Sequence, residues 1–320
     1  MSLRQWLWLS LLASFWGGAF ILMEIALPVF SPLAIVSSRM TVAAIVLNGV
    51  LFSQGQRWPK RPGLWLQCAG LSLLGNLMPF GLVVWGQQYI SASLASILIA
   101  AAPIFTVVLA VFVLKEQLTL SRLLGALLGF GGVVVLIGPE VLNGFSLQGL
   151  GELAILGAAM SYALAGFWGG RFTAIPVKML STMTVTMGAL IMVSSLLGLA
   201  VMPGVDLGAQ LLAQPLAEEL TGNLMGHSIS RWPWAAGLAM VGLGVFSTAL
   251  AYLIYYRLLG EVGVIKTSLV SFLVPFSALL LGATFLGERL DGPSMLGMVL
   301  ILSGLAVLDG RLLSRLQRQV

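Results

Sequence analysis

Long apolar runs, separated by short polar or basic breaks, dominate the chain. A helix needs roughly 20 apolar residues to cross the hydrocarbon core of a bilayer, about 30 Å thick. The runs reach about this length and lack the alternating segments of a membrane β-barrel. The pattern predicts ten transmembrane helices, at residues 5–27, 31–53, 64–87, 92–114, 121–138, 151–171, 179–201, 234–256, 262–286 and 293–310.

The composition agrees with an integral, all-α membrane protein. Of the 320 residues, 59% are hydrophobic and 8% are charged. A soluble domain carries about 25% charged residues, so this chain has too little polar surface to cover one. The net charge of +5 is spread too thinly to form a nucleic-acid-binding face. A single cysteine, Cys68, and a single histidine, His227, exclude a disulfide and clustered metal ligands. We therefore expect no metal and no cofactor.

The basic residues predict the orientation of the spans. Thirteen of the sixteen lie on one side of the predicted helices, from Arg4 to the tail residues 311–318. Only Arg231 and Arg289 lie on the other side, and Arg39 lies inside a span. Loops rich in Lys and Arg face the cytoplasm, so both termini are expected there. The first apolar run continues to Pro28 and is interpreted as an uncleaved first span rather than a signal peptide.

An internal duplication divides the chain into two units. Residues 103–138 align without gaps on 275–310, a shift of 172, with twelve identities in 36 positions. Near the start of each half, Trp16 aligns with Tyr162 at a shift of 146. The difference between the shifts fits an insertion in a long external loop at 203–231, where residues 206–220 are expected to form a short surface helix. The predicted units are 1–140 and 141–320.

Each unit contains five predicted helices. Because five is odd, the second unit must enter the membrane inverted relative to the first. Two inverted five-helix repeats around a central cavity are the architecture of secondary transporters.

Several short motifs are spread over nearly the whole chain. They are Trp16-Gly17-Gly18-Ala19-Phe20, Arg39, Asn76 with Pro79-Phe80, Ser161-Tyr162-Ala163, residues 247–252, and the blocks that start at Pro103 and Pro275. In these motifs the chain resembles the EamA-type, ten-helix bacterial proteins of the drug/metabolite transporter superfamily. The resemblance implies transport of a small metabolite, often efflux, by alternating access, and localisation in the bacterial inner membrane. In many members the position of Glu24 is basic, and this departure weakens the inference that the cavity binds a carboxylate through that residue.

Arg39 and Glu24 are the charged residues placed deepest in the first two spans. Arg39 lies roughly 4.5 Å from the centre of its helix, a depth at which a charge usually faces a cavity or a partner. In one interpretation the two residues form an ion pair that joins their helices. In the other, Arg39 contacts an anionic group of the substrate, or Glu24 takes up a coupling proton. The sequence leaves both open.

Aromatic and small polar residues near the middle of the membrane are candidates for the cavity lining. Interfacial tryptophans and helix-bridging hydroxyls are the structural alternative for such residues. Three prolines, Pro79, Pro103 and Pro275, are candidate kink positions. Glu116 and Glu288, with Thr119 and Asp291, are interpreted as structural residues that precede helices. The cavity candidates are Trp16, Arg39, Asn76, Phe80, Tyr162, Thr248, Tyr252 and Ser271.

The residue content argues against an enzyme and against a channel. No predicted span contains a histidine, and the chain has neither an H-E-x-x-H nor a G-x-S-x-G motif. Nothing resembles a selectivity filter or a ring of charges. The sequence therefore favours a carrier that exports amino acids or related amphipathic compounds, with a drug or toxic-compound exporter as the alternative. Its partners are a small solute and the lipid bilayer, and the oligomeric state is left open.

Overall fold

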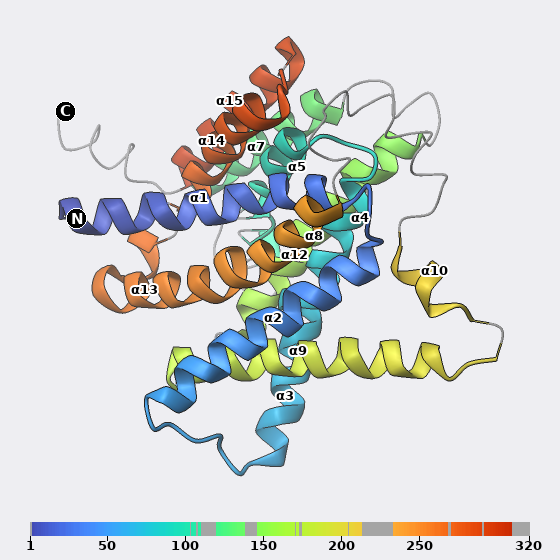
Figure 1. Cartoon of the computed structure of the whole chain (residues 1–320). Coiled ribbons are helices and arrows are strands. Elements are labelled where there is room, and N and C mark those ends of the chain that lie inside the picture. The colour runs from blue at the N-terminus through green and yellow to red at the C-terminus, as the bar shows by residue number, and fades with distance from the viewer. Residues whose placement is uncertain are drawn as a thin grey trace.

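The computed structural model describes most of the chain (Figure 1). The described residues are 2–102, 104–106, 108–109, 120–137, 146–169, 171–172, 175–203, 205–212, 233–267, 270–289 and 291–308. His227, Pro103, Glu116 and Thr119 lie outside them.

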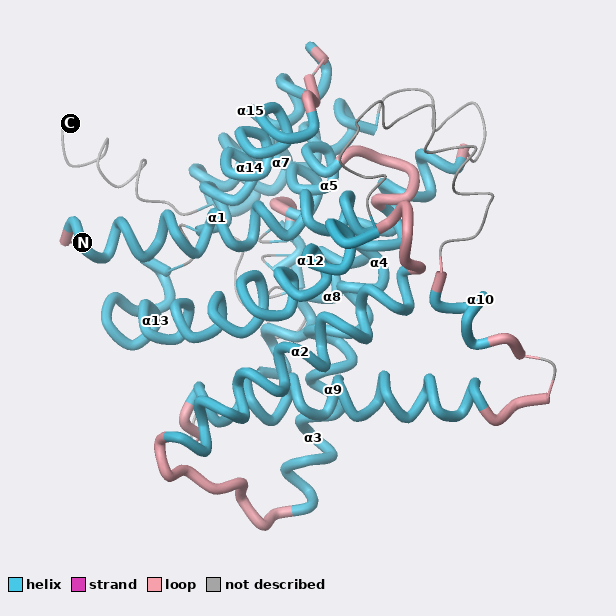
Figure 2. Tube along the Cα trace, viewed as in Figure 1, coloured by secondary structure: helices cyan, strands magenta, loops and turns pink. Residues whose placement is uncertain are grey.

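The described residues form helices joined by loops and turns, with one isolated β-bridge between Phe30 and Leu212 (Figure 2). The α-helices are α1 (Leu3–Ala26), α2 (Pro32–Ser53), α3 (Pro62–Ser72), α4 (Met78–Gly86), α5 (Ala92–Ile99), α7 (Leu120–Ile137), α8 (Leu147–Gly169), α9 (Val177–Ala200), α10 (Leu207–Leu211), α12 (Pro233–Gly244), α13 (Ala251–Thr267), α14 (Val270–Leu281) and α15 (Gly292–Leu308). Three π-helical stretches complete the list, η1 (Leu73–Leu77), η4 (Val245–Leu250) and η5 (Gly282–Leu286).

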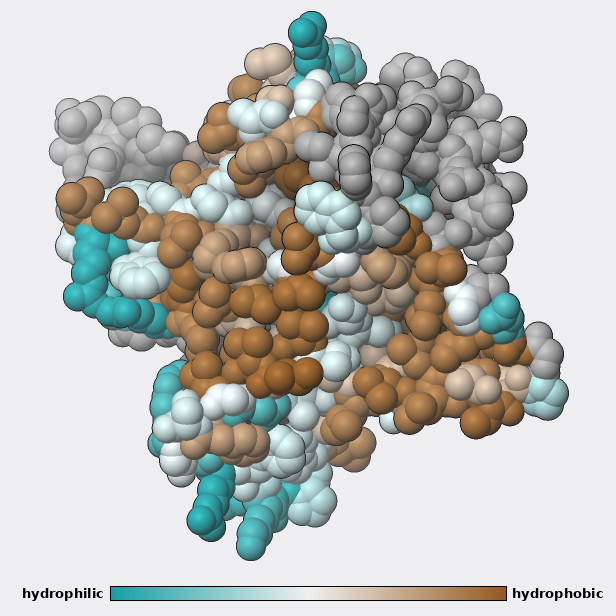
Figure 3. All heavy atoms as spheres, viewed as in Figure 1, coloured by the Kyte–Doolittle hydropathy of each residue, from teal (hydrophilic) through white to brown (hydrophobic). Residues whose placement is uncertain are grey.

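Six of the predicted spans are helices long and apolar enough to cross a membrane. They are Leu3–Ala26, Pro32–Ser53, Pro62–Gly86, Leu147–Gly169, Lys178–Ala200 and Trp234–Tyr255. Apolar helices of 10–17 residues lie in the other four predicted spans. Apolar side chains cover much of the face seen in Figure 3, and hydrophilic ones gather at its ends. The chain is a multi-pass, all-helical membrane protein.

The prediction of separate spans at 234–256 and 262–286 was wrong at their junction. Helix α13 continues to Thr267, and the next helix begins only at Val270. The ion pair between Arg257 Nε and Glu261 Oε1, at 2.9 Å and a spacing of four residues, supports this continuation. The charges that we took for a break therefore lie on the surface of one helix.

The backbones of α7 and α15 approach each other closely at glycine residues. A Cβ added at Gly132 would lie 2.7 Å from the carbonyl oxygen of Gly297, and one added at Gly304 would lie 2.6 Å from that of Gly125. Glycine is therefore required at both positions for the backbones to approach this closely.

Under the predicted repeat, two elements of the first half match two elements of the second half. A shift of 172 carries Leu73–Leu77, which is η1, onto residues 245–249 of η4. The same shift carries the start of α7, Leu120, onto the start of α15, Gly292. The π-helical stretches η1 and η4 thus fall at matched positions of the two halves, whereas the positions that match η5, 110–114, lie outside the described residues.

The described part of the predicted external loop is short. Helix α10 has five residues and is joined to the start of α2, where Ser31 N and Oγ donate to the carbonyl oxygens of Leu211 and Gln210 at 3.0 and 2.7 Å. The expected surface helix at 206–220 is thus described only over its first part.

Candidate functional site

Two π-helical stretches carry the polar groups at the centre of the described bundle. Asn76 lies in η1, and Ser247 and Thr248 lie in η4; all three are buried. A π-turn shifts the following side chains out of α-helical register, and such turns are frequent at functional sites. Thr248 Oγ1 donates to the carbonyl oxygen of Leu243, five residues earlier, at 3.0 Å. The winding therefore fixes the direction of this hydroxyl group.

Arg39, on α2, is the centre of the cluster. Its Nε donates to Thr248 Oγ1 at 2.8 Å, and its guanidinium carbon lies 3.7 Å from the centroid of the Phe80 ring. A cation over the face of an aromatic ring is attracted by the quadrupole of the ring. The residue is only 6% exposed.

No carboxylate neutralises Arg39 within the described residues. The ion pairs there are Arg4–Glu261 and Arg257–Glu261, and the hydrogen bond of Arg39 uses only its Nε. Removing an unpaired guanidinium from water is costly, so its retention indicates a function or an anionic partner. The two Nη groups of Arg39 can hold a carboxylate through two parallel hydrogen bonds.

An amide and two phenols complete the surroundings of Arg39. Tyr252 Oη, on α13, donates to Asn76 Oδ1 at 2.8 Å. Tyr162, on α8, and Tyr252 both lie near Arg39. Ser247 Oγ is buried and has no hydrogen-bond partner within the described residues. The cluster therefore offers one cation, one aromatic face, and hydroxyl and amide groups for orienting a small solute.

The structure brings together six of the eight predicted cavity residues. They are Arg39, Asn76, Phe80, Tyr162, Thr248 and Tyr252. Trp16 instead contacts Tyr255, with ring centroids 5.7 Å apart. The side chain of Ser271 lies outside what the structure describes.

Two of the predicted kink prolines lie inside described helices. Pro79 is the second residue of α4, directly after the π-helical stretch η1, and Pro275 lies inside α14. Gly17 on α1 packs against the same part of α14, because an added Cβ would lie 2.8 Å from the backbone nitrogen of Ala278.

The predicted ion pair between Glu24 and Arg39 is not formed. Glu24 Oε2 instead accepts a hydrogen bond from Ala92 N, at the start of α5, at 2.8 Å. The first N–H groups of a helix lack partners inside the helix and carry partial positive charge, so they are good donors to a carboxylate. Glu24 lies at the end of α1 that meets α5, away from the depth of Arg39.

A second carboxylate, Glu288, meets Glu24 at the same helix start. Ala92 N also lies 3.1 Å from Glu288 Oε1, and Ser93 N lies 3.2 Å from Glu288 Oε2. The hydroxyl group of Ser93 donates to that oxygen as well. The two glutamates, from α1 and from the loop before α15, thus share one backbone donor.

Glu288 and Ser247 are residues near these groups that the sequence did not select as site candidates. Glu288 lies before α15, as the sequence predicted, and it also contacts the start of α5. The repeat aligned Glu288 with Glu116, but no pattern in the sequence indicated a partner 195 residues away.

Outside the membrane-spanning segments, local hydrogen bonds account for two perturbed carboxyl groups. The hydrogen bond from Arg257 holds the pKa of Glu261 below its usual range. Hydrogen bonds from Ser294 lower the pKa of Asp291. Ser294 N donates to Asp291 Oδ1 at 3.0 Å, which confirms that Asp291 caps α15.

Known proteins of similar sequence are transporters. A 27% identical relative, covering 95% of this chain and 98% of its own length, is an uncharacterized transporter of Archaeoglobus fulgidus. Another, 27% identical over 91% of this chain and 90% of its own, is the probable amino-acid metabolite efflux pump of Escherichia coli K12. A third, 24% identical over 98% of this chain and 97% of its own, is the probable terminal-alkyne amino-acid exporter of Streptantibioticus cattleyicolor.

The fold and the family agree with these relatives. A solved crystal structure with 20% sequence identity superposes with a TM-score of 0.56, over 95% of this chain and 98% of that chain. The model of the EamA-like transporter family matches twice, at residues 4–138 and 149–308. These names describe transporters and not enzymes. Because the two matches together cover most of the sequence, the chain belongs to the EamA-like transporter family.

Proposed function

We propose that this transporter exports amino acids or related amphipathic metabolites, and that the substrate carboxylate binds Arg39. The observation that carries the proposal is the buried guanidinium group, which no described carboxylate neutralises and which lies over the ring of Phe80. A carboxylate of the solute supplies the missing charge, and its apolar part packs on the aromatic side chains. In this proposal Ser247 Oγ, which is buried without a hydrogen-bond partner among the described residues, and the amide of Asn76 orient the polar groups of the solute.

Transport proceeds, in this proposal, by alternating access between two inverted five-helix repeats, 1–140 and 141–320. The two matches of the family model, one in each half, support the duplication. The matched positions of η1 and η4 under one shift support it as well. Each π-helical stretch contributes to the Arg39 cluster, so the cluster combines groups from both repeats.

The test is a counterflow experiment in proteoliposomes. Vesicles loaded with one unlabelled amino acid should accumulate the same labelled amino acid transiently, and saturably, because a carrier exchanges solutes one for one. A panel of amino acids, their amides and lipophilic cations separates the substrate classes. Counterflow of cations alone would favour the drug exporter, and flux without counterflow would indicate a channel.

The orientation belongs to the same proposal. Thirteen basic residues on one side of the predicted spans, against two on the other, support cytoplasmic termini in the inner membrane. Reporter fusions at both ends of the chain check this, and reporters on opposite faces of the membrane would contradict it.

Proton coupling is proposed at the pair formed by Glu24 and Glu288. Two carboxylates that share one N–H donor repel each other when both are ionised, which favours a proton held between them. Other charged groups lie on neighbouring elements: Glu152 is buried on α8, which packs against α5, and Arg289 and Asp291 are exposed beside Glu288. The charge of the pair therefore depends chiefly on whether this proton is bound.

The coupling proposal has its own variant. Glu24→Gln should abolish uptake or export driven by a proton gradient and leave counterflow intact, because counterflow needs no net proton movement. Gradient-driven transport that is unchanged in Glu24→Gln across pH would remove the proposal. Loss of counterflow as well would indicate a structural role of the pair.

A further inference from the structure

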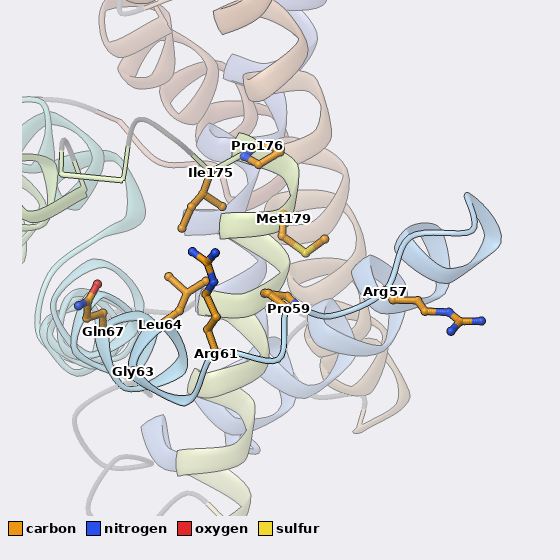
Figure 4. Close-up of a pocket in the computed structure, with 9 residues that line it drawn as sticks. All are labelled: Arg57, Pro59, Arg61, Gly63, Leu64, Gln67, Ile175, Pro176 and Met179. Atoms are coloured by element: carbon orange, nitrogen blue, oxygen red, sulfur yellow. The ribbon is translucent and has the colours of Figure 1, made fainter.

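A cavity of about 580 Å³ lies where α3 and α9 begin, and none of the residues of the Arg39 cluster lines it (Figure 4). It is formed by the loop after α2, the first turn of α3 and the first turn of α9. Arg57, Arg61 and Gln67 contribute the long polar side chains. In Figure 4 the guanidinium group of Arg61 points toward Ile175, and Arg57 extends outward.

The charge around this cavity has one sign. The two segments that meet there, residues 54–63 and 170–179, contain Arg57, Lys60, Arg61, Arg171 and Lys178 and no acidic residue. Lys178 Nζ donates to the neutral oxygen of Gln54 at 2.8 Å. Arg57 and Arg61 form no ion pair within the described residues. The guanidinium groups of Arg57 and Arg61 are therefore available to bind an anion.

Two helix starts add to this positive potential. Helix α3 begins directly after Arg61, and α9 begins directly after Pro176; neither of these residues accepts a hydrogen bond with its side chain as a cap. Arg61 and Pro176 both line the cavity. The first N–H groups of a helix and its dipole attract anions, phosphate in particular.

The remaining wall is apolar. Leu64, Ile175 and Met179 line the cavity beside the arginines, and Ile175 and Met179 are half-buried. An inorganic anion has no apolar part that could pack on this wall, whereas the glycerol and upper acyl chain of a lipid can pack on it. The predicted cytoplasmic side of the spans, where Arg57 and Arg61 lie, is also where anionic lipids and basic residues meet.

We propose that this cavity binds the phosphate of an anionic phospholipid, held by Arg61 and Arg57 between the starts of α3 and α9. The site is separate from the transport cluster and does not depend on the identity of the transported solute. A bound lipid there joins the first turn of α3, in the first half of the chain, to the first turn of α9, in the second half.

The experiment titrates delipidated full-length protein in a neutral detergent with short-chain phosphatidylglycerol and counts bound lipid by native mass spectrometry. Phosphatidylcholine, inorganic phosphate and glycerol 3-phosphate are the comparison probes. We expect saturable binding of phosphatidylglycerol, in preference to phosphatidylcholine, that the two soluble phosphates do not displace at equal concentration. Displacement by inorganic phosphate at equal concentration would overturn the assignment to a lipid.

The chain offers a matched control in the same loop. Arg61→Gln removes a charge-assisted contact and should weaken phosphatidylglycerol binding about tenfold. Lys60→Gln removes the same charge from the adjacent residue, which is exposed like Arg61 but does not line the cavity, and should change binding by less than about twofold. Equal losses in the two variants would show general surface attraction and overturn the proposal.

A second variant keeps the proposal testable if Arg61→Gln does not fold. Met179→Glu leaves both arginines in place and introduces a like charge for the phosphate, so binding should fall at least as far as in Arg61→Gln. Thermal unfolding of each variant in detergent verifies its folded state. Undiminished binding in a folded Met179→Glu protein contradicts the proposed location.

Discussion

Replacement of Arg39 by glutamine gives the sharpest test of the transport site. In the structure the guanidinium group uses Nε for Thr248 and its face for Phe80, which leaves both Nη groups for a solute. A hydrogen bond to a charged group contributes about 1.5–3 kcal/mol. Arg39→Gln should therefore weaken binding of a carboxylate-bearing solute by about tenfold to a hundredfold. The affinity of Arg39→Lys for this solute should lie between those of the unmodified protein and Arg39→Gln, because lysine keeps the charge but lacks the planar guanidinium group.

The assay compares two solutes in each protein. Half-saturation of counterflow is measured for an amino acid that the unmodified protein exchanges, and for the matching amide, which lacks the carboxylate. The expected loss is specific to the carboxylate, so the preference for acid over amide should shrink in Arg39→Gln. If both solutes lose affinity by the same factor, Arg39 supports the structure of the site rather than binding the substrate.

Three further variants test other parts of the molecule. Gly132→Val should destabilise the folded protein by about 1–3 kcal/mol in detergent unfolding, because its Cβ would lie 2.7 Å from a carbonyl oxygen of α15, whereas Gly131→Val, with nothing within 4 Å of its Cβ, should be nearly neutral. Asp291→Ala should increase hydrogen exchange in the first turn of α15, at a cost of about 1 kcal/mol. Ser294 lowers the pKa of Asp291, so this contribution is present at neutral pH and is lost as the pH falls below the ordinary value of 3.8; a difference in protection between the two proteins, corrected for intrinsic exchange, that stays constant well below this pH would contradict it. Glu288→Gln should reproduce the transport phenotype of its carboxylate neighbour on α1, because the two groups share one donor; full proton coupling in this variant would exclude a shared proton.

The helices could largely be predicted, because lipid requires continuous apolar runs, and each predicted span contains an apolar helix among the described residues. The junction near Arg257 could not, since charges at a spacing of four residues equally suit a loop or an exposed helical surface. The π-helical winding at η1 and η4 also left no mark in the hydropathy pattern. One extra residue in a turn changes which side chains face inward without changing their composition.

Most residues of the candidate site could be predicted from the sequence, but not all of the contacts between them. Arg39, Asn76 and Tyr252 were chosen because polar groups at that depth need a reason to be there, and the structure brings them into one cluster. An ion pair of Glu24 with Arg39 was one of two interpretations left open, and in the structure Glu24 contacts the start of α5, beside Glu288. Ala92 and Glu24 are 68 positions apart in the sequence, and Ser93 and Glu288 are 195 apart. Such contacts depend on the packing of helices, which a single sequence does not encode locally.

The winding of η1 and η4 has a mechanical consequence. A π-turn holds about one residue more than an α-turn, and each residue of an α-helix advances it by about 100° around its axis. If such a stretch rewound to α geometry, the rest of its helix would swivel by up to that amount with its backbone hydrogen bonds preserved. Asn76 lies in η1 and Thr248 lies in η4, so the carboxamide and the hydroxyl group would rotate with these stretches. Release of a bound solute would then require only a twist of two helices, with no hinge bending and no helix broken in the membrane.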